Sequence, residues 1–313
     1  MRAVVLINKA GGGAADGIAA RIGDALAGAG IDSEVLLVES KDCAAIAADQ
    51  VKNGTKLLIA AGGDGTMGAV AGELAGSGTS LGILPLGTLN HFARDLGIPF
   101  ALDEAAKVIA NGKARKVDIA EVNGRTFVNN AAIGLYPLMV VDRDAQRQRL
   151  GRSKRLAMLV ASLRTMTRFH ARRLRLSTDG GEARVDTPLL LVGNNHYRLA
   201  MPGAGSREAL DRGELSIMVM RSKSLPGFLA ATGRALLGLT RHDDMVRLDG
   251  VRELKVDSPR SHLTVAMDGE TVALAPPLTF RIRPKALRVI APELSAEGRP
   301  TERRASPGRT RSR

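Results

Sequence analysis

Short apolar runs alternate with amphipathic stretches over the first third of the chain. The segments follow one another as strand, helix, strand, with the apolar positions spaced as each type of element requires. The eight segments cover residues 3–7, 18–29, 34–38, 44–51, 57–61, 67–74, 81–84 and 101–110. This alternation predicts an α/β layered domain with a mainly parallel sheet, which we assign to residues 1–120.

The pattern changes after residue 117 to short alternating strands bounded by Asn-Gly, Asp-Gly and Pro. Such strands predict an antiparallel β domain over residues 121–293, with one helical interlude at 150–169. The tail, 294–313, is rich in Arg, Pro, Ser and Gly, and we expect it to be disordered. The chain is therefore predicted to have two domains.

The net charge of the chain indicates which classes of partner it can bind. The 313 residues include 45 Lys and Arg against 32 Asp and Glu, a net charge of +13 that attracts anionic surfaces or phosphorylated ligands. Two tyrosines, six phenylalanines and no tryptophan argue against a base-stacking surface, so no specific nucleic acid is expected.

The single cysteine, Cys43, fits a reducing compartment, and no window offers the roughly 20 apolar residues of a membrane span. The apolar run at 3–7 ends in a polar residue and glycines, which is typical of a first strand and not of a signal peptide. We expect a cytoplasmic protein.

The segment 143–175 carries eleven Lys or Arg residues and one acid, Asp144, with apolar residues interleaved. This pattern is typical of a basic amphipathic helix on an anionic lipid surface. The alternative is a solvated helix whose apolar face packs on its own β domain, which is the common case for amphipathic helices.

The stretch "AAGGDGTMGAV" at 60–70 places Asp64 inside a glycine-rich turn that follows a strand. A carboxylate beside a bound phosphate repels it unless a cation lies between them, and Mg²⁺ binds through one or two carboxylates plus phosphate oxygens. The glycine backbone and the following helix N-terminus would then hold the phosphates of a nucleotide, with Thr66 supplying a hydroxyl. In the alternative interpretation, Asp64 simply caps the helix that starts at Gly65.

With "GGDGT" at 62–66 followed by "LGILPLGTLNHFARDLGIP" at 81–99, the chain closely resembles the bacterial diacylglycerol kinase family of lipid kinases, which includes sphingosine and ceramide kinases. The resemblance implies an α/β domain like those of NAD kinase and 6-phosphofructokinase, a C-terminal β-sandwich, and ATP and Mg²⁺ as cofactors. It also implies transfer of the γ-phosphate to a lipid hydroxyl, and a homodimer is possible.

The resemblance assigns nucleotide contacts to two glycine turns and to the end of the first strand. These residues are Asn8, Lys9, Gly62, Gly63, Asp64, Gly65, Thr66, Gly87, Thr88 and Asn90. A solvated lysine is the alternative at Lys9. Two acids are expected in the metal network beneath the phosphates: Asp64, and Asp118 in the stretch "KVDIA".

The motif "VAMDGETV" at 265–272 resembles the family's "LDGE" stretch, which carries the catalytic base. By itself Asp268-Gly269 predicts a hairpin turn. The resemblance makes Asp268 the expected base for the lipid hydroxyl, with Glu270 as the alternative.

Three departures from the family pattern concern the site. His91 replaces an Asp, and Gly68-Ala69 stand where Asn-Glu is common. "LDRG" at 210–213 has Arg212 where a magnesium-ligating acid is usual, which leaves Asp211 as the candidate ligand.

A fourth departure concerns lipid recognition. The family's glycine-rich loop is replaced by "NNHYRLAMPGAG" at 194–205, so contacts with the lipid are expected to differ.

The predicted function is an ATP- and Mg²⁺-dependent lipid kinase that docks peripherally on an anionic membrane. The alternatives are an NAD kinase, which shares "GGDGT", and a non-catalytic protein on a kinase fold that binds lipid or polyanions.

Overall fold

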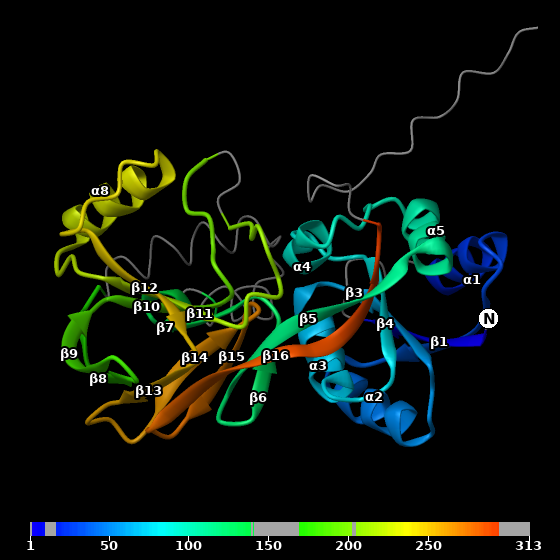
Figure 1. The fold of residues 1–313 in the computed structure, drawn as a ribbon, viewed down its shortest axis with the longest axis horizontal. Helices are drawn as coiled ribbons and strands as arrows, with labels where there is room; N and C mark the ends of the chain where they lie inside the picture. The colour runs from blue at the N-terminus through cyan, green and yellow to red at the C-terminus, as the bar shows by residue number, and fades with distance from the viewer. Residues whose placement is uncertain (1, 10–16, 139, 141–168, 202–204, 294–313) are drawn as a thin grey trace, which may run out of the picture.

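The computed structural model describes residues 2–9, 17–138, 140, 169–201 and 205–293, and it shows an α/β part and a β part joined by one long sheet (Figure 1). The ten-stranded sheet has the order β2-β1-β3-β4-β16-β13-β8-β9; in addition, β5 pairs with β16, and β6 pairs with β5. A separate six-stranded sheet has the order β12-β11-β10-β7-β14-β15.

The α/β part contains four parallel strands with helices packed on them. The strands are β1 (Arg2–Asn8), β2 (Asp32–Val38), β3 (Leu57–Gly62) and β4 (Ser80–Pro85). The helices are α1 (Ile18–Gly28), α2 (Cys43–Lys52), α3 (Asp64–Leu74), α4 (His91–Asp95) and α5 (Leu102–Asn111), with a 3₁₀ turn, η1, at Ser40–Asp42. Every residue of β3 is buried, as expected for a central parallel strand covered on both faces.

The β part is a sandwich. Its six-stranded sheet is antiparallel throughout and comprises β7 (Asn130–Gly134), β10 (Leu189–Asn194), β11 (Leu215–Met220), β12 (Met245–Val251), β14 (Leu263–Met267) and β15 (Glu270–Leu274). Opposite lie β6 (Arg125–Phe127), β8 (Arg172–Thr178), β9 (Gly181–Thr187) and β13 (Glu253–Asp257), with parts of β5 and β16. One helix, α8 (Leu225–Leu236), connects β11 to β12.

Two strands, β5 (Lys113–Val122) and β16 (Leu278–Ala291), run through both parts as an antiparallel pair. At one end β16 pairs with β13, and at the other end Arg288 and Val289 pair with β4 in parallel. The pairing of β16 with β5 shifts register between Arg283 and Leu287, where Lys285 has φ +52°. The final strand thus contributes to both hydrophobic cores, and the boundary expected near residue 120 falls within β5.

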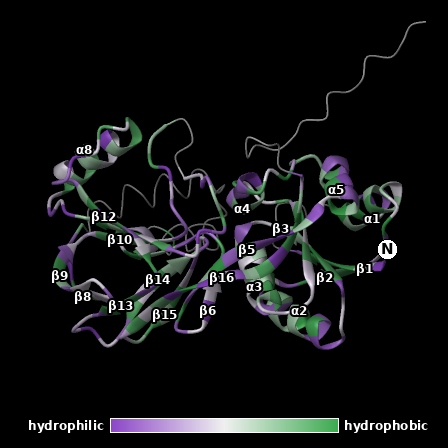
Figure 2. Cartoon of the chain, in the orientation of Figure 1, coloured by the Kyte–Doolittle hydropathy of each residue, from purple (hydrophilic) through white to green (hydrophobic). Residues whose placement is uncertain are grey.

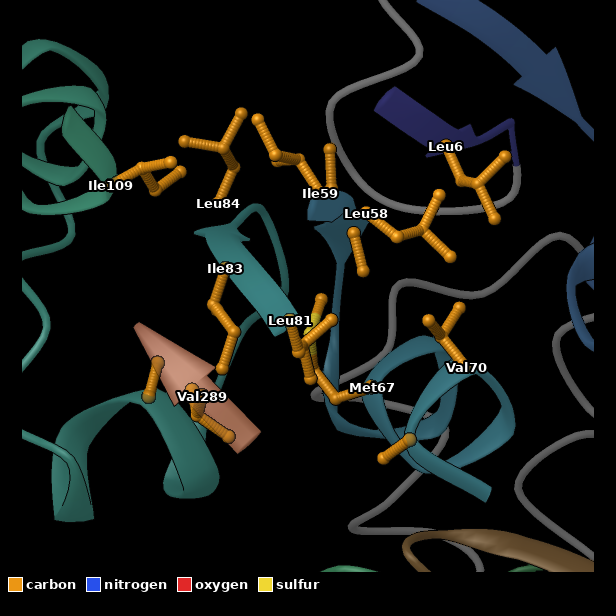
Figure 3. Packing of buried hydrophobic residues seen from close by; sticks show 14 of the residues in the cluster. Leu6, Leu58, Ile59, Met67, Val70, Leu81, Ile83, Leu84, Ile109 and Val289 are labelled. Atoms are coloured by element: carbon orange, nitrogen blue, oxygen red, sulfur yellow. The ribbon is translucent and has the colours of Figure 1, made fainter. Parts of the chain in front are cut away.

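The first core forms between the parallel sheet and its helices, and it fixes the strand ends that carry the site. Figure 3 shows Leu58 of β3, Leu81 of β4, Met67 of α3 and Val289 of β16 among its members. Figure 2 shows hydrophobic colour along the central strands of both parts, which matches the two separate clusters of buried residues.

The predicted fold class is confirmed: an α/β domain precedes an antiparallel β-sandwich. The eight predicted segments of the first domain all occur within one to three residues of their expected bounds. Among the helices described, α4 and α8 were missed, and α8 shows that the expectation of a single helical interlude in the second domain was wrong.

Two predictions lie outside the described residues: most of the basic segment at 143–175 and the tail at 294–313. Within the described part of the chain, no helix combines the length and the apolar character needed to cross a bilayer.

Replacing Leu58 with Ala removes a fully buried side chain between sheet and helix, and we expect the free energy of unfolding to fall by about 2–5 kcal/mol. Urea unfolding measures this loss. Leu37→Ala on the edge strand β2 is the matched control, because Leu37 is 51% exposed and its truncation should cost far less. Equal losses at the two positions would contradict the described core.

Candidate active site

The two glycine turns meet backbone to backbone at the carboxyl ends of β3 and β4. The Leu86 N–H donates to the carbonyl of Gly62 at 3.0 Å. A Cβ on Gly87 would lie 2.6 Å from the Cα of Gly63, and one on Gly63 would lie 3.3 Å from the Cα of Gly87. Glycine is therefore required at 87, and the contact brings two separate sequence motifs into one site.

Asp64 joins the same two motifs through its carboxylate. Oδ2 accepts the His91 N–H at 3.1 Å and Oδ1 accepts the Phe92 N–H at 3.0 Å. Asp64 thus caps the N-terminus of α4 and not its own helix: the N-cap of α3 is Gly63, with no side-chain cap. The alternative in which Asp64 caps the helix from Gly65 is wrong. A magnesium-binding role remains a prediction, which the two hydrogen bonds permit because each carboxylate oxygen can accept more than one.

Asn90 closes the second turn upon itself. It adopts φ +47°, its Oδ1 accepts the Gly87 N–H at 2.9 Å, and its Nδ2 donates to the Gly87 carbonyl at 2.9 Å. The buried Asn90 side chain therefore sets the shape of the turn, while Thr88 at its tip is exposed.

The end of β1 supports the first turn from the side. Asn8 Nδ2 donates to Thr66 Oγ1 at 2.8 Å, and Ser40 Oγ donates to Asn8 Oδ1 at 2.9 Å. Lys9 is exposed and pairs with Glu39 at 3.2 Å. The structure brings Asn8 and Thr66 together, and Lys9 lies beside them at the surface.

Asp268 occupies a strained turn between β14 and β15, at φ +48°. Its carboxylate accepts the N–H groups of Val128 and Asn129, both at 2.8 Å. Burial, together with the charge of Asp64, outweighs the opposing effects of these N–H groups and of Arg207, and the pKa of Asp268 is raised to about 7. A carboxylate with a pKa near neutrality is suited to accept and release a proton.

The Asp268–Glu270 turn packs against two glycines of α3. A Cβ on Gly68 would lie 2.7 Å from Asp268 Oδ2, and one on Gly65 would lie 2.7 Å from Glu270 Oε1. Gly68, noted above as a departure from the family, thus provides the space that the Asp268 carboxylate fills. Glu270 is exposed, whereas Asp268 is held from several sides.

Glu270 also lies near the start of α2. Burial raises the pKa of the Cys43 thiol to about 11, and the charge of Glu270 adds to this rise. The Cys43 thiol therefore stays protonated at neutral pH.

Asp118 is buried, and both its carboxylate oxygens are engaged by backbone groups. Oδ2 accepts the Gly213 N–H at 2.6 Å, and Oδ1 accepts the Lys285 N–H at 2.7 Å. Asp118 therefore ties the 210–213 turn to the irregularity in β16, while Asp211 is exposed.

The three predicted metal carboxylates, Asp64, Asp118 and Asp211, do not form one metal group. Among the described residues, no group of three or more His, Cys, Asp or Glu side chains could hold a metal ion.

Arg207 and Asp95 form a buried ion pair that sequence reasoning missed. Arg207 Nε donates to Asp95 Oδ2 at 2.7 Å, and neither side chain is more than 1% exposed. The guanidinium also donates to the Val128 carbonyl at 2.6 Å and to Asn129 Oδ1 at 2.8 Å. It therefore connects α4 to the same residues whose N–H groups hold Asp268.

Aromatic rings enclose this guanidinium, with its carbon 6.0 Å from the Phe92 ring centre and 5.3 Å from that of Tyr197. Asp95 lies within the second motif, but no sequence signal linked it to Arg207, more than a hundred residues away.

Family models match both parts of the chain. Residues 2–122 match the diacylglycerol kinase catalytic domain, and residues 139–291 match the YegS C-terminal NAD kinase beta sandwich-like domain.

Similar proteins cover most of the chain. It is 31% identical over 257 residues to a "Probable lipid kinase YegS-like" of Pseudomonas aeruginosa, covering 81% of this chain and 82% of that one. It is 28% identical to a diacylglycerol kinase of Bacillus subtilis over 77% of this chain and 79% of that one. The crystal structure of a diacylglycerol kinase from Bacillus anthracis strain Sterne shares the fold, with a TM-score of 0.67, 21% identity, and coverage of 93% of this chain and 96% of that one.

Replacing Arg207 with Met should lower the free energy of unfolding by about 3–5 kcal/mol, because the Asp95 carboxylate stays buried without its partner. Urea unfolding of the single variants and of the Asp95→Leu/Arg207→Met double variant measures this. The double variant should recover much of the loss.

Arg198→Met is the matched control, since its pair with Glu208 is exposed and should contribute no more than about 1 kcal/mol. If Arg207→Met lowers the free energy of unfolding as little as Arg198→Met does, the buried ion pair contributes no more to stability than an exposed one.

Proposed function

This chain belongs to the diacylglycerol kinase family of lipid kinases, and on that premise we propose that it transfers the γ-phosphate of ATP, with Mg²⁺, to a hydroxyl of a membrane lipid. The observation that carries the proposal is the position of Asp268, a carboxylate of pKa about 7 packed against the glycine-rich start of α3.

The glycine turns fit the phosphates of a nucleotide. The N-terminus of α3 has no side-chain cap, so its first N–H groups are disposed to bind an anion. At Gly63 and Gly87 the backbones of the two turns lie in contact, and a side chain at position 87 would clash with the other turn. The residues that would hold ATP are those of the two turns, 62–66 and 87–90, supported by Asn8.

Asp64 is the residue that would hold Mg²⁺ beside these phosphates, since its carboxylate lies at the junction of both turns. When bound, the ion neutralises charge on the phosphoryl group as it transfers. Asp118, with both oxygens engaged by backbone N–H groups, would act on this site through the 210–213 turn.

Asp268 would serve as the general base. Its carboxylate accepts the proton of the lipid hydroxyl while that oxygen forms a bond to the γ-phosphorus and the bond to the ADP oxygen breaks. The Val128 and Asn129 N–H groups hold the carboxylate in place. Arg207 in turn holds these two residues by donating to the Val128 carbonyl and to Asn129 Oδ1. Glu270 is exposed over the first turn of α3, which favours Asp268 as the base.

The proposed acceptor is a lipid with a primary or secondary hydroxyl at headgroup level, such as diacylglycerol, ceramide, a sphingoid base or phosphatidylglycerol. We further propose that the enzyme works from the cytoplasm on an anionic leaflet, aided by its +13 charge and the basic segment 143–175. A homodimer is part of the same proposal.

Transfer of labelled phosphate from ATP in mixed micelles, with each of these lipids offered separately, tests the function. We expect label in one lipid class, and Asp268→Asn should lower kcat by about 10²–10⁴-fold because proton acceptance is lost. Glu270→Gln should retain most activity. NAD is offered as a further acceptor in a separate reaction. If label enters NAD and none of the lipids, an NAD kinase replaces the proposal.

The pH dependence tests the base. For an acid with pKa about 7, the active carboxylate form declines as pH falls, so kcat/KM should drop about tenfold per pH unit below 7 and level off above it. The initial rate over this range, with protein stability checked at each pH, measures the profile. A profile already level at pH 5 would exclude Asp268 as a base of raised pKa.

Gly68→Ala should lower kcat while the KM for ATP stays nearly constant, because the added methyl displaces the Asp268 carboxylate without reaching the glycine turns. Gly78→Ala is the control, since a Cβ there meets nothing within 4 Å. Unchanged kcat in Gly68→Ala would show that the carboxylate position is not critical.

A further inference from the structure

Helix α8 and the turn that follows it expose an unusual number of large apolar side chains. Leu229, Leu236, Leu237 and Leu239, together with Met201, are each between 43% and 74% exposed. Scattered exposed leucines are ordinary, but a group of this size gathered around one helix end marks an interaction site.

Direct contacts place Met201 beside the end of α8. The Met201 N–H donates to the Leu236 carbonyl at 2.8 Å, and a Cβ on Gly238 would lie 3.4 Å from the Cβ of Ala200. The chain before Met201 therefore lies against the end of α8. Figure 2 shows hydrophobic colour along α8 at the outer edge of the sandwich.

The opposite side of α8 is fixed to the protein. Ala231 is buried, the Phe228 ring lies 5.7 Å from that of Phe169, and Ser224 caps the first turn by accepting the Gly227 N–H. Arg234 pairs with Asp244 at the other end, and this bond holds the pKa of Asp244 at about 2. The leucines are thus presented by a helix that is already ordered.

Basic side chains flank the leucines. Arg221, Lys223 and Arg241 are exposed at the two ends of the helix segment, and Lys223 forms an exposed ion pair with Asp186 at 3.6 Å. The charge of Asp244 is matched by Arg234, which leaves Asp243 as the remaining acid between residues 221 and 248. An apolar surface with a basic border complements an anionic lipid surface.

The same surface adjoins the candidate active site along the chain. Tyr197, whose ring lies 5.3 Å from the Arg207 guanidinium, precedes Met201 by four residues, which span at most about 14 Å. A bilayer in contact with Met201 would therefore lie within a short reach of the site.

We propose that Leu229, Leu236, Leu237, Leu239 and Met201 form a lipid-docking surface, with the leucines inserted among the lipids and Arg221, Lys223 and Arg241 against anionic headgroups. The choice of a bilayer as occupant rests on the proposed lipid kinase function.

Vesicle sedimentation of the full chain tests the proposal without any phosphate transfer. The vesicles are phosphatidylcholine with or without phosphatidylglycerol, and the variant is Leu236→Ser/Leu237→Ser/Leu239→Ser. Binding to the anionic vesicles should fall at least about tenfold, since each leucine contributes buried apolar area. Leu37→Ser/Phe100→Ser is the control, with two side chains of comparable exposure in the α/β part, and it should bind like the wild type.

A second variant, Arg221→Glu/Arg241→Glu, should weaken binding several-fold at low salt and much less at high salt. Thermal unfolding confirms that each variant is folded, and activity on a short-chain lipid dispersed below its micelle concentration should be retained by all of them. If the wild type itself shows no such activity, the kinase function is refuted, and the docking surface is still tested by vesicle binding. Two results would overturn the docking surface: unchanged vesicle binding in the leucine variant, or a protein dimer in the wild type that this variant dissociates.

Discussion

The close approach of Gly63 to Gly87 is the constraint from which the rest of the site follows. Two adjacent parallel strands end at the same edge of the sheet, and the bare backbone at these positions lets their turns touch. Any side chain at 87 would separate them. Because the turns touch, the Asp64 carboxylate at the start of α3 reaches the N-terminus of α4. Helices α3 and α4 therefore begin next to each other.

From this point a continuous set of contacts reaches the β-sandwich. Helix α4 ends at Asp95, which pairs with Arg207, and Arg207 bonds to Val128 and Asn129. Those two residues hold Asp268, whose carboxylate returns to α3 beside Gly68. The two glycine turns and the proposed base therefore belong to one closed arrangement, although they come from different domains.

Much of this organisation could be predicted from the sequence. The strand and helix segments of the first domain follow from apolar spacing, and the motif pair around Asp64 and Asn90 pointed to the two glycine turns that meet in the structure. Helix α4 was missed because five residues are too few to show a helical period. Helix α8 was missed because Gly227 and Gly233 interrupt its apolar pattern.

Other features depend on contacts between residues far apart in the chain, which no local pattern encodes. The pairing of Arg207 with Asp95 is one example. Asp118 is another: the resemblance suggested a metal acid, and nothing in the sequence indicated that its two oxygens accept the N–H groups of Gly213 and Lys285. Burial, which raises the pKa of Asp268, is likewise a property of the folded arrangement.

The passage of β5 and β16 through both cores has a consequence for motion. A flexible linker would let the two halves swing freely, but here any rotation between them must twist a pair of hydrogen-bonded strands. The pairing of the two strands is least regular at the register shift between Arg283 and Leu287, where the Asp118 carboxylate accepts the Lys285 N–H. A rotation of one half against the other would therefore also strain this buried hydrogen bond.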